Sequence, residues 1–168
     1  LSIQLKRVAS AFPPSAIKTG MLAEADLVGE VAAFVKSRPG LPLVVDPVIR
    51  AGAGAALLSD AGVERLQRDL LPLARLVTPN LPEAEILLGA TIRTPADFAE
   101  APRRLHERYG CEVLLKGGHF AAGDAATVED HAWIDGSAVV FARPRLPVPD
   151  VHGTGCTLSA AIASRLAL

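Results

Sequence analysis

Residues 41–48 read Leu-Pro-Leu-Val-Val-Asp-Pro-Val, a nearly unbroken apolar run with one carboxylate, Asp46, close to its C-terminal end. Runs of this kind are typical of strands that are buried on both faces of a parallel sheet. The flanking sequence agrees, because a one-sided helical pattern over 24–37 ends at Pro39-Gly40 and a Gly/Ala-rich loop over 51–56 follows. We therefore predict a buried strand between two helical segments.

The alternation of helix and strand continues on both sides of this segment. A helical pattern over 3–12 and a short extended segment over 16–20 precede it. A helix capped by Ser59 and running to Leu71, a strand over 75–78, a helix from Thr94-Pro95 to Tyr109 and a strand over 112–116 follow it. The C-terminal part predicts a hairpin of residues 127–134 and 137–143 joined by Asp135-Gly136, and a last helix that starts just after Gly153-Thr-Gly-Cys156.

This order of elements predicts an α/β fold. We expect a mostly parallel sheet with helices on both faces and an antiparallel hairpin at one edge. Ligands of such sheets bind beyond the carboxyl ends of the strands. The segments to inspect for function are therefore residues 46–48, 78–80, 116–118 and 152–156.

Composition excludes several classes of protein. The chain has 168 residues, of which 50% are hydrophobic, and this is enough for one packed core. A formal net charge of -1 with no basic cluster argues against nucleic acid as a partner. Two cysteines without metal-ligand spacing argue against a disulfide framework and against zinc. No apolar stretch is long enough to span a bilayer and no signal-peptide layout is present, so we expect a cytoplasmic protein with no membrane contact.

The glycine-rich segment His152-Gly153-Thr154-Gly155-Cys156-Thr157 precedes a helical run of small residues. Glycines let the backbone approach a ligand closely, and successive N–H groups at the start of a helix converge on an anion. The segment therefore predicts a phosphate or oxyanion site, with Cys156 at a position where the helix dipole favours the thiolate. In the alternative interpretation the glycines only turn the chain into the helix and Cys156 is a small buried residue.

Residues 78–83, Thr-Pro-Asn-Leu-Pro-Glu, follow a predicted strand and open a helix. Asn80 and Glu83 have the spacing of a capping box. The same two side chains could also offer oxygen atoms to the water shell of Mg²⁺. Both interpretations can hold together, because a capped helix is a rigid platform.

Three further residues stand at strand ends. Lys116 is one of four lysines, and a lysine suits a phosphate as a compact point charge. Asp46 and His119 are also candidates for the ligand edge. For each of them the alternative is an ordinary solvated residue at the end of a strand.

Taken together, five segments resemble the hydroxymethylpyrimidine/phosphomethylpyrimidine kinases of thiamine synthesis, which are ribokinase-like proteins. The segments, in the order found in that family, are residues 16–22, 44–48, 78–83, 115–119 and 152–157. Cys156 is the most informative position, because most of the wider superfamily has an aspartate there. A cysteine points to the pyrimidine kinases or to pyridoxal kinases derived from them.

The resemblance implies a role for each matching residue. Cys156 would be the catalytic base, and Gly153, Thr154 and Gly155, with the Cys156 N–H, would form the anion hole. Asp46, Asn80, Glu83 and Lys116 would serve the ATP and Mg²⁺ side, with Glu83 reaching the metal through water. Met21 and Val48 would line the pyrimidine ring.

The resemblance implies an ATP- and Mg²⁺-dependent phosphotransferase. Its substrate would be the small molecule 4-amino-5-hydroxymethyl-2-methylpyrimidine, and then the monophosphate of that compound. Residues 1–168 would form one kinase domain that lacks the N-terminal and C-terminal parts of the family. This domain could form a homodimer. Two alternatives stay open: a pyridoxal kinase of the same branch, and a non-catalytic domain that binds a nucleotide or a pyrimidine phosphate.

Overall fold

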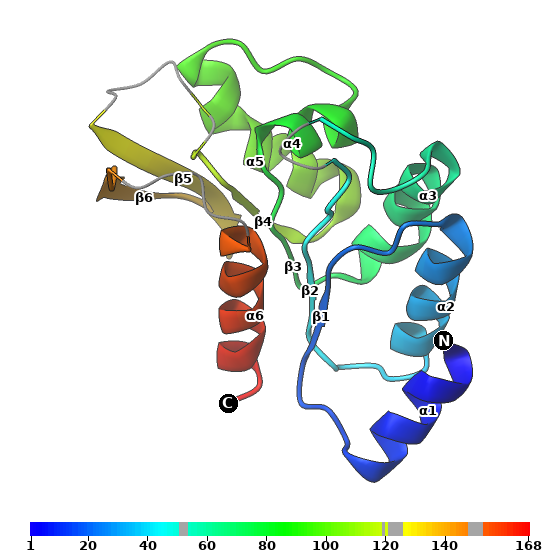
Figure 1. Ribbon diagram of the computed structural model, residues 1–168. Helices are drawn as coiled ribbons and strands as arrows, with labels where there is room; N and C mark the ends of the chain where they lie inside the picture. Colours follow the sequence, from blue (N-terminus) through cyan, green and yellow to red (C-terminus); the bar gives the residue numbers. More distant parts are fainter. Residues whose placement is uncertain (51–53, 119, 121–125, 148–152) are drawn as a thin grey trace.

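The computed structural model describes residues 1–50, 54–118, 120, 126–147 and 153–168. Within these residues, six strands form one sheet in their order along the chain (Figure 1). The first four are parallel: β1 (Ile17–Thr19), β2 (Leu43–Val45), β3 (Leu76–Val77) and β4 (Glu112–Leu115). The last two, β5 (Thr127–Ile134) and β6 (Ser137–Pro144), are antiparallel. The predicted parallel sheet with an antiparallel edge hairpin is therefore confirmed.

The strands are shorter than the apolar runs that predict them. β2 covers three residues of the run 41–48, although the ladder continues where the Asp46 N–H donates to the carbonyl of Thr19 at 3.2 Å. Pro42 and Pro47 have no N–H to donate, which limits the regular pairing at both ends. The hairpin turn is as expected, since Asp135 and Gly136 both have positive φ angles, of 50° and 73°.

Helices cover both faces of the sheet, as predicted. One face carries α2 (Ala25–Lys36), α3 (Asp60–Arg65), α4 (Leu81–Leu88) and α5 (Pro95–Tyr109), whereas α6 (Thr154–Leu166) lies on the other (Figure 1). α1 (Ser2–Ala11) packs beside α2 and buries none of its residues. Within the described part of the chain, no helix combines the length and the apolar character needed to cross a bilayer.

Two helical predictions need correction. The helix capped by Ser59 ends at Arg65, and the chain continues as a π-helical turn (Leu66–Leu70, η1) and a 3₁₀ turn (Leu71–Leu73, η2). Pro72 lacks the N–H that a continuing α-helix needs there. The last helix begins at Thr154, so Thr154, Gly155 and Cys156 form its first turn instead of preceding it.

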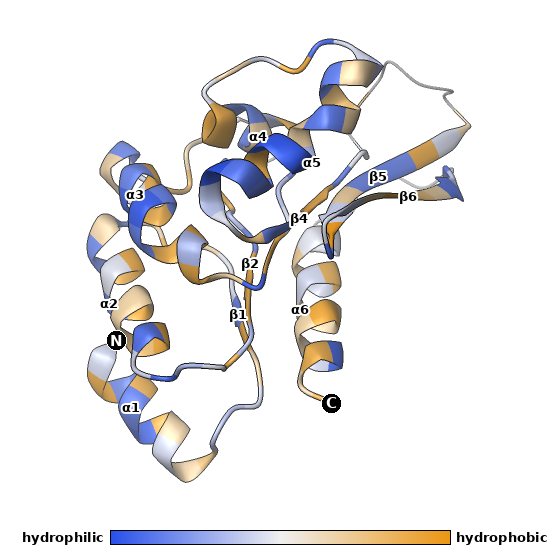
Figure 2. Ribbon diagram, turned by 180° about the vertical axis from the view of Figure 1, so that it is seen from behind, coloured by the Kyte–Doolittle hydropathy of each residue, from blue (hydrophilic) through white to orange (hydrophobic). Residues whose placement is uncertain are grey.

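Side chains that alternate along the strands divide the core into two clusters. The larger cluster joins Leu43, Val45 and Val77 to helices α2–α5. The smaller one joins Leu76 and Leu114 to α6. In Figure 2, orange segments recur along the central strands and alternate with blue segments around the helices. Both faces of the central strands β2–β4 are therefore largely buried, and the residue after each strand lies at an edge between two helical layers.

Candidate active site

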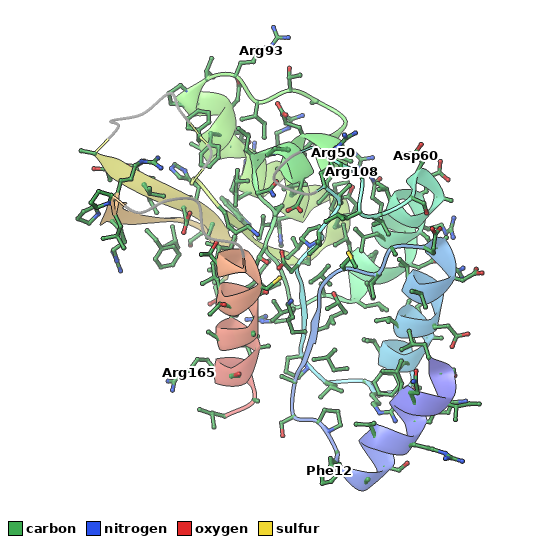
Figure 3. All side chains as sticks on the ribbon, in the orientation of Figure 1. Phe12, Arg50, Asp60, Arg93, Arg108 and Arg165 are labelled. Carbon is green, nitrogen blue, oxygen red and sulfur yellow. The ribbon has the colours of Figure 1, made fainter. Side chains whose placement is uncertain are left out.

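The carboxyl ends of the parallel strands and the N-terminal end of α6 meet at one edge of the sheet (Figure 1). Asp46 follows β2 and Lys116 follows β4. Strand pairing puts Lys18, Val44 and Asp46 on the face that α6 covers, because side chains two residues apart share a face. The exposed Arg165 marks the opposite end of α6, away from this edge (Figure 3).

Asp46 is the centre of a group of polar side chains. It is 3% exposed, and its Oδ1 accepts a hydrogen bond from Lys116 Nζ at 3.3 Å. Its Oδ2 accepts one from Ser159 Oγ at 3.2 Å and lies 3.9 Å from Lys18 Nζ. A buried carboxylate needs such partners to offset the loss of its hydration. Lys116 also interacts electrostatically with Glu83, so two lysines and two carboxyl groups lie at this edge.

Lys116 is held in place at the junction of β3, β4 and α6. Its N–H donates to the Pro79 carbonyl at 2.9 Å, and it forms a parallel bridge with Asn80. Its side chain is 18% exposed, so the alternative of a lysine extending into water is wrong. A Cβ at Gly155 would lie 3.1 Å from Lys116 Nζ, which puts this ammonium group against the first turn of α6.

The first turn of α6 has the features of an anion site. Gly153 is the N-cap residue with a φ of +92°, a conformation that glycine adopts without strain. The N–H groups of Thr154, Gly155 and Cys156 occupy the positions that have no partner within a helix. Cys156 is exposed, so the alternative in which it is a small buried residue is wrong. Backbone donors, a lysine and a thiol therefore gather in one place.

Asn80 and Glu83 form the predicted capping box of α4. Asn80 Oδ1 accepts from the Glu83 N–H, and Glu83 Oε2 accepts from the Asn80 N–H, both at 2.9 Å. Glu83 Oε1 also accepts from the Ile49 N–H at 3.2 Å, which ties the loop after Asp46 to α4. Burial raises the pKa of Glu83, and the nearby Asp46 charge raises it further, while hydrogen bonds and Lys116 oppose this.

Met21 and Val48 lie on the neighbouring loops that follow β1 and β2. Met21 is 60% exposed and Val48 is half-buried. Val48 has a φ of +43°, which is strained for a β-branched residue. Strain of this kind is found at functional sites more often than elsewhere. The two positions share the ligand edge, and their joint contact with a ring stays a prediction.

Three residues at this edge escape sequence reasoning. Lys18 and Ser159 contact Asp46 from β1 and α6, although they look like a strand residue and a small helix residue. The hydroxyl of Thr78, just after β3, is fully buried and has no hydrogen-bond partner among the described residues. The sequence does hold one clue to Ser159: it lies four residues after Gly155, which places it one helical turn further along the same side of the predicted helix. His119 and His152 lie outside the described residues.

The Phosphomethylpyrimidine kinase family model matches residues 1–168. The thiamine biosynthesis bifunctional protein ThiED of Geobacter sulfurreducens is 45% identical over 165 residues, which are 98% of this chain and 33% of that protein. The hydroxymethylpyrimidine/phosphomethylpyrimidine kinase of Haemophilus influenzae is 38% identical over 99% of this chain and 62% of its own length. The chain thus spans less than two thirds of these relatives.

Solved structures of related kinases have the same fold as this chain. An ADP complex of Bacillus subtilis pyridoxal kinase superposes with a TM-score of 0.84 at 31% identity, over 98% of this chain and 61% of the other. A phosphomethylpyrimidine kinase from Clostridium difficile has a TM-score of 0.83 at 32% identity, over 99% and 66%. These similarities confirm the ribokinase-like fold predicted from the sequence.

Proposed function

The chain belongs to the phosphomethylpyrimidine kinase family, and from this premise we propose that it carries the phosphoryl-transfer site of an ATP-dependent kinase. The proposed acceptor is the hydroxymethyl group of 4-amino-5-hydroxymethyl-2-methylpyrimidine, followed by the monophosphate of that compound. The observation that supports this best is the position of Lys116 Nζ, which donates to Asp46 and lies beside Gly155 in the first turn of α6. Residues 1–168 are proposed to act as one domain, built on one continuous sheet.

The site suits phosphoryl transfer because that reaction depends mostly on position and on charge stabilisation. In the proposed step the acceptor oxygen attacks the γ-phosphorus, a new O–P bond forms, and the bond from phosphorus to the leaving ADP oxygen breaks. The N–H groups of Gly155 and Cys156 stabilise the charge on the transferred group. The Cys156 thiolate takes the proton of the acceptor hydroxyl.

ATP is the proposed phosphoryl donor. Structures of related pyridoxal kinases are complexes with ADP and with AMP-PCP, which supports the use of ATP. Lys116 would neutralise a nucleotide phosphate as a point charge. Asp46 would keep that ammonium group in place through the 3.3 Å hydrogen bond.

Mg²⁺ is proposed to bind together with the nucleotide. No group of three acidic, histidine or cysteine side chains converges on a point among the described residues. Mg²⁺ usually keeps several waters and binds through one or two carboxylates and the phosphates of its substrate. Asp46 and, through water, Glu83 would hold it, and the unpartnered Thr78 hydroxyl could bond to its water shell. When bound, the ion would neutralise charge on the nucleotide phosphates.

A pyridoxal kinase is the second candidate, because several of the similar structures are pyridoxal kinases with TM-scores of 0.84. A non-catalytic sensor is the third, but an exposed Cys156 beside free backbone donors favours catalysis. We further propose that the protein is cytoplasmic and forms a homodimer. Analytical ultracentrifugation tests the dimer.

The deciding experiment is a phosphoryl-transfer assay on the full-length protein with ATP and Mg²⁺. The hydroxymethylpyrimidine, its monophosphate and pyridoxal serve as parallel acceptors, and ADP and the phosphorylated products are measured. We expect turnover of both pyrimidines, and near-complete loss of hydroxymethyl phosphorylation with unchanged ATP affinity in Cys156→Ala. Preferential turnover of pyridoxal supports the second candidate. Calorimetric binding of ATP without any turnover supports the sensor.

A further inference from the structure

Lys18 has a position that the roles assigned so far do not use. It lies in β1 on the face that α6 covers, and its Nζ is 3.9 Å from Asp46 Oδ2. A Cβ at Gly20 would lie 3.0 Å from the same Nζ. The ammonium group therefore lies over the turn that leads directly to Met21, on the proposed pyrimidine side. Its side chain is 21% exposed, which leaves it accessible to a ligand.

Lys116 occupies the other side of the same carboxylate. It bonds to Oδ1 of Asp46, and its Nζ lies against Gly155 in the first turn of α6. Lys18 and Lys116 are thus separated by Asp46, one towards the pyrimidine loop and one towards the anion site. Each ammonium group therefore faces a different side of Asp46, where it can attract a separate negative charge.

The two proposed transfers differ in the charge of the acceptor. In the first, a neutral hydroxyl loses its proton to Cys156 as its oxygen bonds to phosphorus and ADP leaves. In the second, the acceptor is a phosphate monoester that carries about -1.5 to -2 charges at pH 7. Its dianion attacks through an oxygen that has no proton to lose, so the O–P bond forms and the bond to ADP breaks without a base. Repulsion between the two phosphoryl groups becomes the larger obstacle.

We infer that Lys18 is the acceptor-side cation of this site and selectively supports transfer to the phosphorylated pyrimidine. This inference rests on the proposed function, and it names the group that lets one site accept both a neutral and an anionic substrate. The Lys18 ammonium group binds the phosphate of the monophosphate substrate, while Asp46 keeps this ammonium group oriented. Lys116 stays on the nucleotide side and serves both transfers.

The test compares both transfers in full-length Lys18→Met. The readout is the ratio of kcat/KM for the monophosphate to kcat/KM for the hydroxymethyl compound. We expect this ratio to fall about ten- to a hundredfold, the loss typical of one charge-assisted contact. Lys18→Arg should restore much of the ratio because it keeps the charge. Lys36→Met, at an exposed lysine on α2, should leave the ratio unchanged.

Lys116→Met should lower both transfers together and leave their ratio near that of the wild type. An equal effect of Lys18→Met on both transfers, or no effect, would overturn the inference while the proposed function stands. If Lys18→Met does not fold, calorimetric titration of the monophosphate into the unmutated, Lys18→Gln and Lys18→Arg proteins replaces the kinetic comparison. Unchanged affinity in Lys18→Gln would then overturn the inference. A wild-type protein that phosphorylates neither pyrimidine would refute the proposed function, and the inference with it.

Discussion

Ser159 Oγ donates a hydrogen bond of 3.2 Å to Asp46 Oδ2, which joins the first turns of α6 to the end of β2. The Ser159 side chain is fully buried, and its hydroxyl also lies 3.0 and 3.1 Å from the carbonyls of Gly155 and Cys156. One side chain thus sets the distance between the anion site and the carboxylate that holds both lysines. Ser159 is a positioning residue, since it acts on the reaction through Asp46.

Ser159→Ala is expected to lower kcat more than it raises KM for ATP. The substitution leaves Asp46 Oδ2 with Lys18 alone, and removal of a buried partner costs about 1–3 kcal/mol of stability. Steady-state kinetics and urea unfolding measure the two effects. Ser164→Ala is a matched control, because Ser164 lies on the same helix, is exposed, and likewise donates to a carbonyl one turn back, that of Ala160. Equal kinetics for the two variants would contradict the positioning role.

The two cysteines are expected to differ strongly in reactivity. Cys111 is 2% exposed, and burial raises its pKa to about 12, so almost none of it is thiolate at neutral pH. Cys156 is exposed in the first turn of α6. Iodoacetamide at pH 7.5 should therefore modify one site, which peptide mass spectrometry identifies as Cys156. Cys111→Ala should keep this pattern, and rapid modification of Cys111 in the folded protein would contradict the burial argument.

Substitutions at Gly155 separate two contributions to the anion site. Gly155→Ala keeps the backbone N–H but brings a Cβ to 3.1 Å from Lys116 Nζ, and a flexible lysine can move away. Gly155→Pro also removes the N–H, at a helix position where proline is tolerated. We expect kcat of the proline variant to be about 10²-fold below that of the alanine variant, as for loss of one oxyanion donor. Kinetics with matched circular dichroism spectra test this, and similar kcat values would exclude a role for the N–H.

Glu83 should leave a signature in the pH dependence of stability. Its pKa is raised in the folded protein chiefly by burial, so the folded state keeps a proton that the unfolded chain has already lost. The contribution of Glu83 is full below the unfolded pKa and declines as pH rises through the folded pKa. Glu83→Gln removes this slope. It also loses one of the bonds from Asn80 or Ile49, at a cost of about 1–3 kcal/mol.

Urea unfolding of wild type and Glu83→Gln from pH 4 to pH 8 measures the difference between the two slopes. Glu30→Gln is the control, because Glu30 is exposed on α2. Parallel curves for wild type and Glu83→Gln, offset by a constant free energy, would show that Glu83 has the same pKa in the folded and unfolded states.

The amino-acid sequence by itself determines the order of strands and helices in this protein. Apolar runs such as 41–48 and capping patterns such as Asn80 with Glu83 act over a few residues, so their effects can be deduced locally. The five segments of the family resemblance also predict Asp46, Lys116 and Cys156 as members of one site. Boundaries are less predictable, and the first turn of α6 begins at Thr154 rather than after Cys156.

Only the tertiary structure decided which charges meet. Lys18, Asp46 and Ser159 are far apart along the chain, and their contacts depend on the register of β1 with β2 and on the placement of α6 over the sheet. Packing between elements sets these distances, and no local pattern encodes them. Short-range preferences therefore account for the elements and the main site residues, whereas long-range packing brings two lysines and a serine to one buried carboxylate.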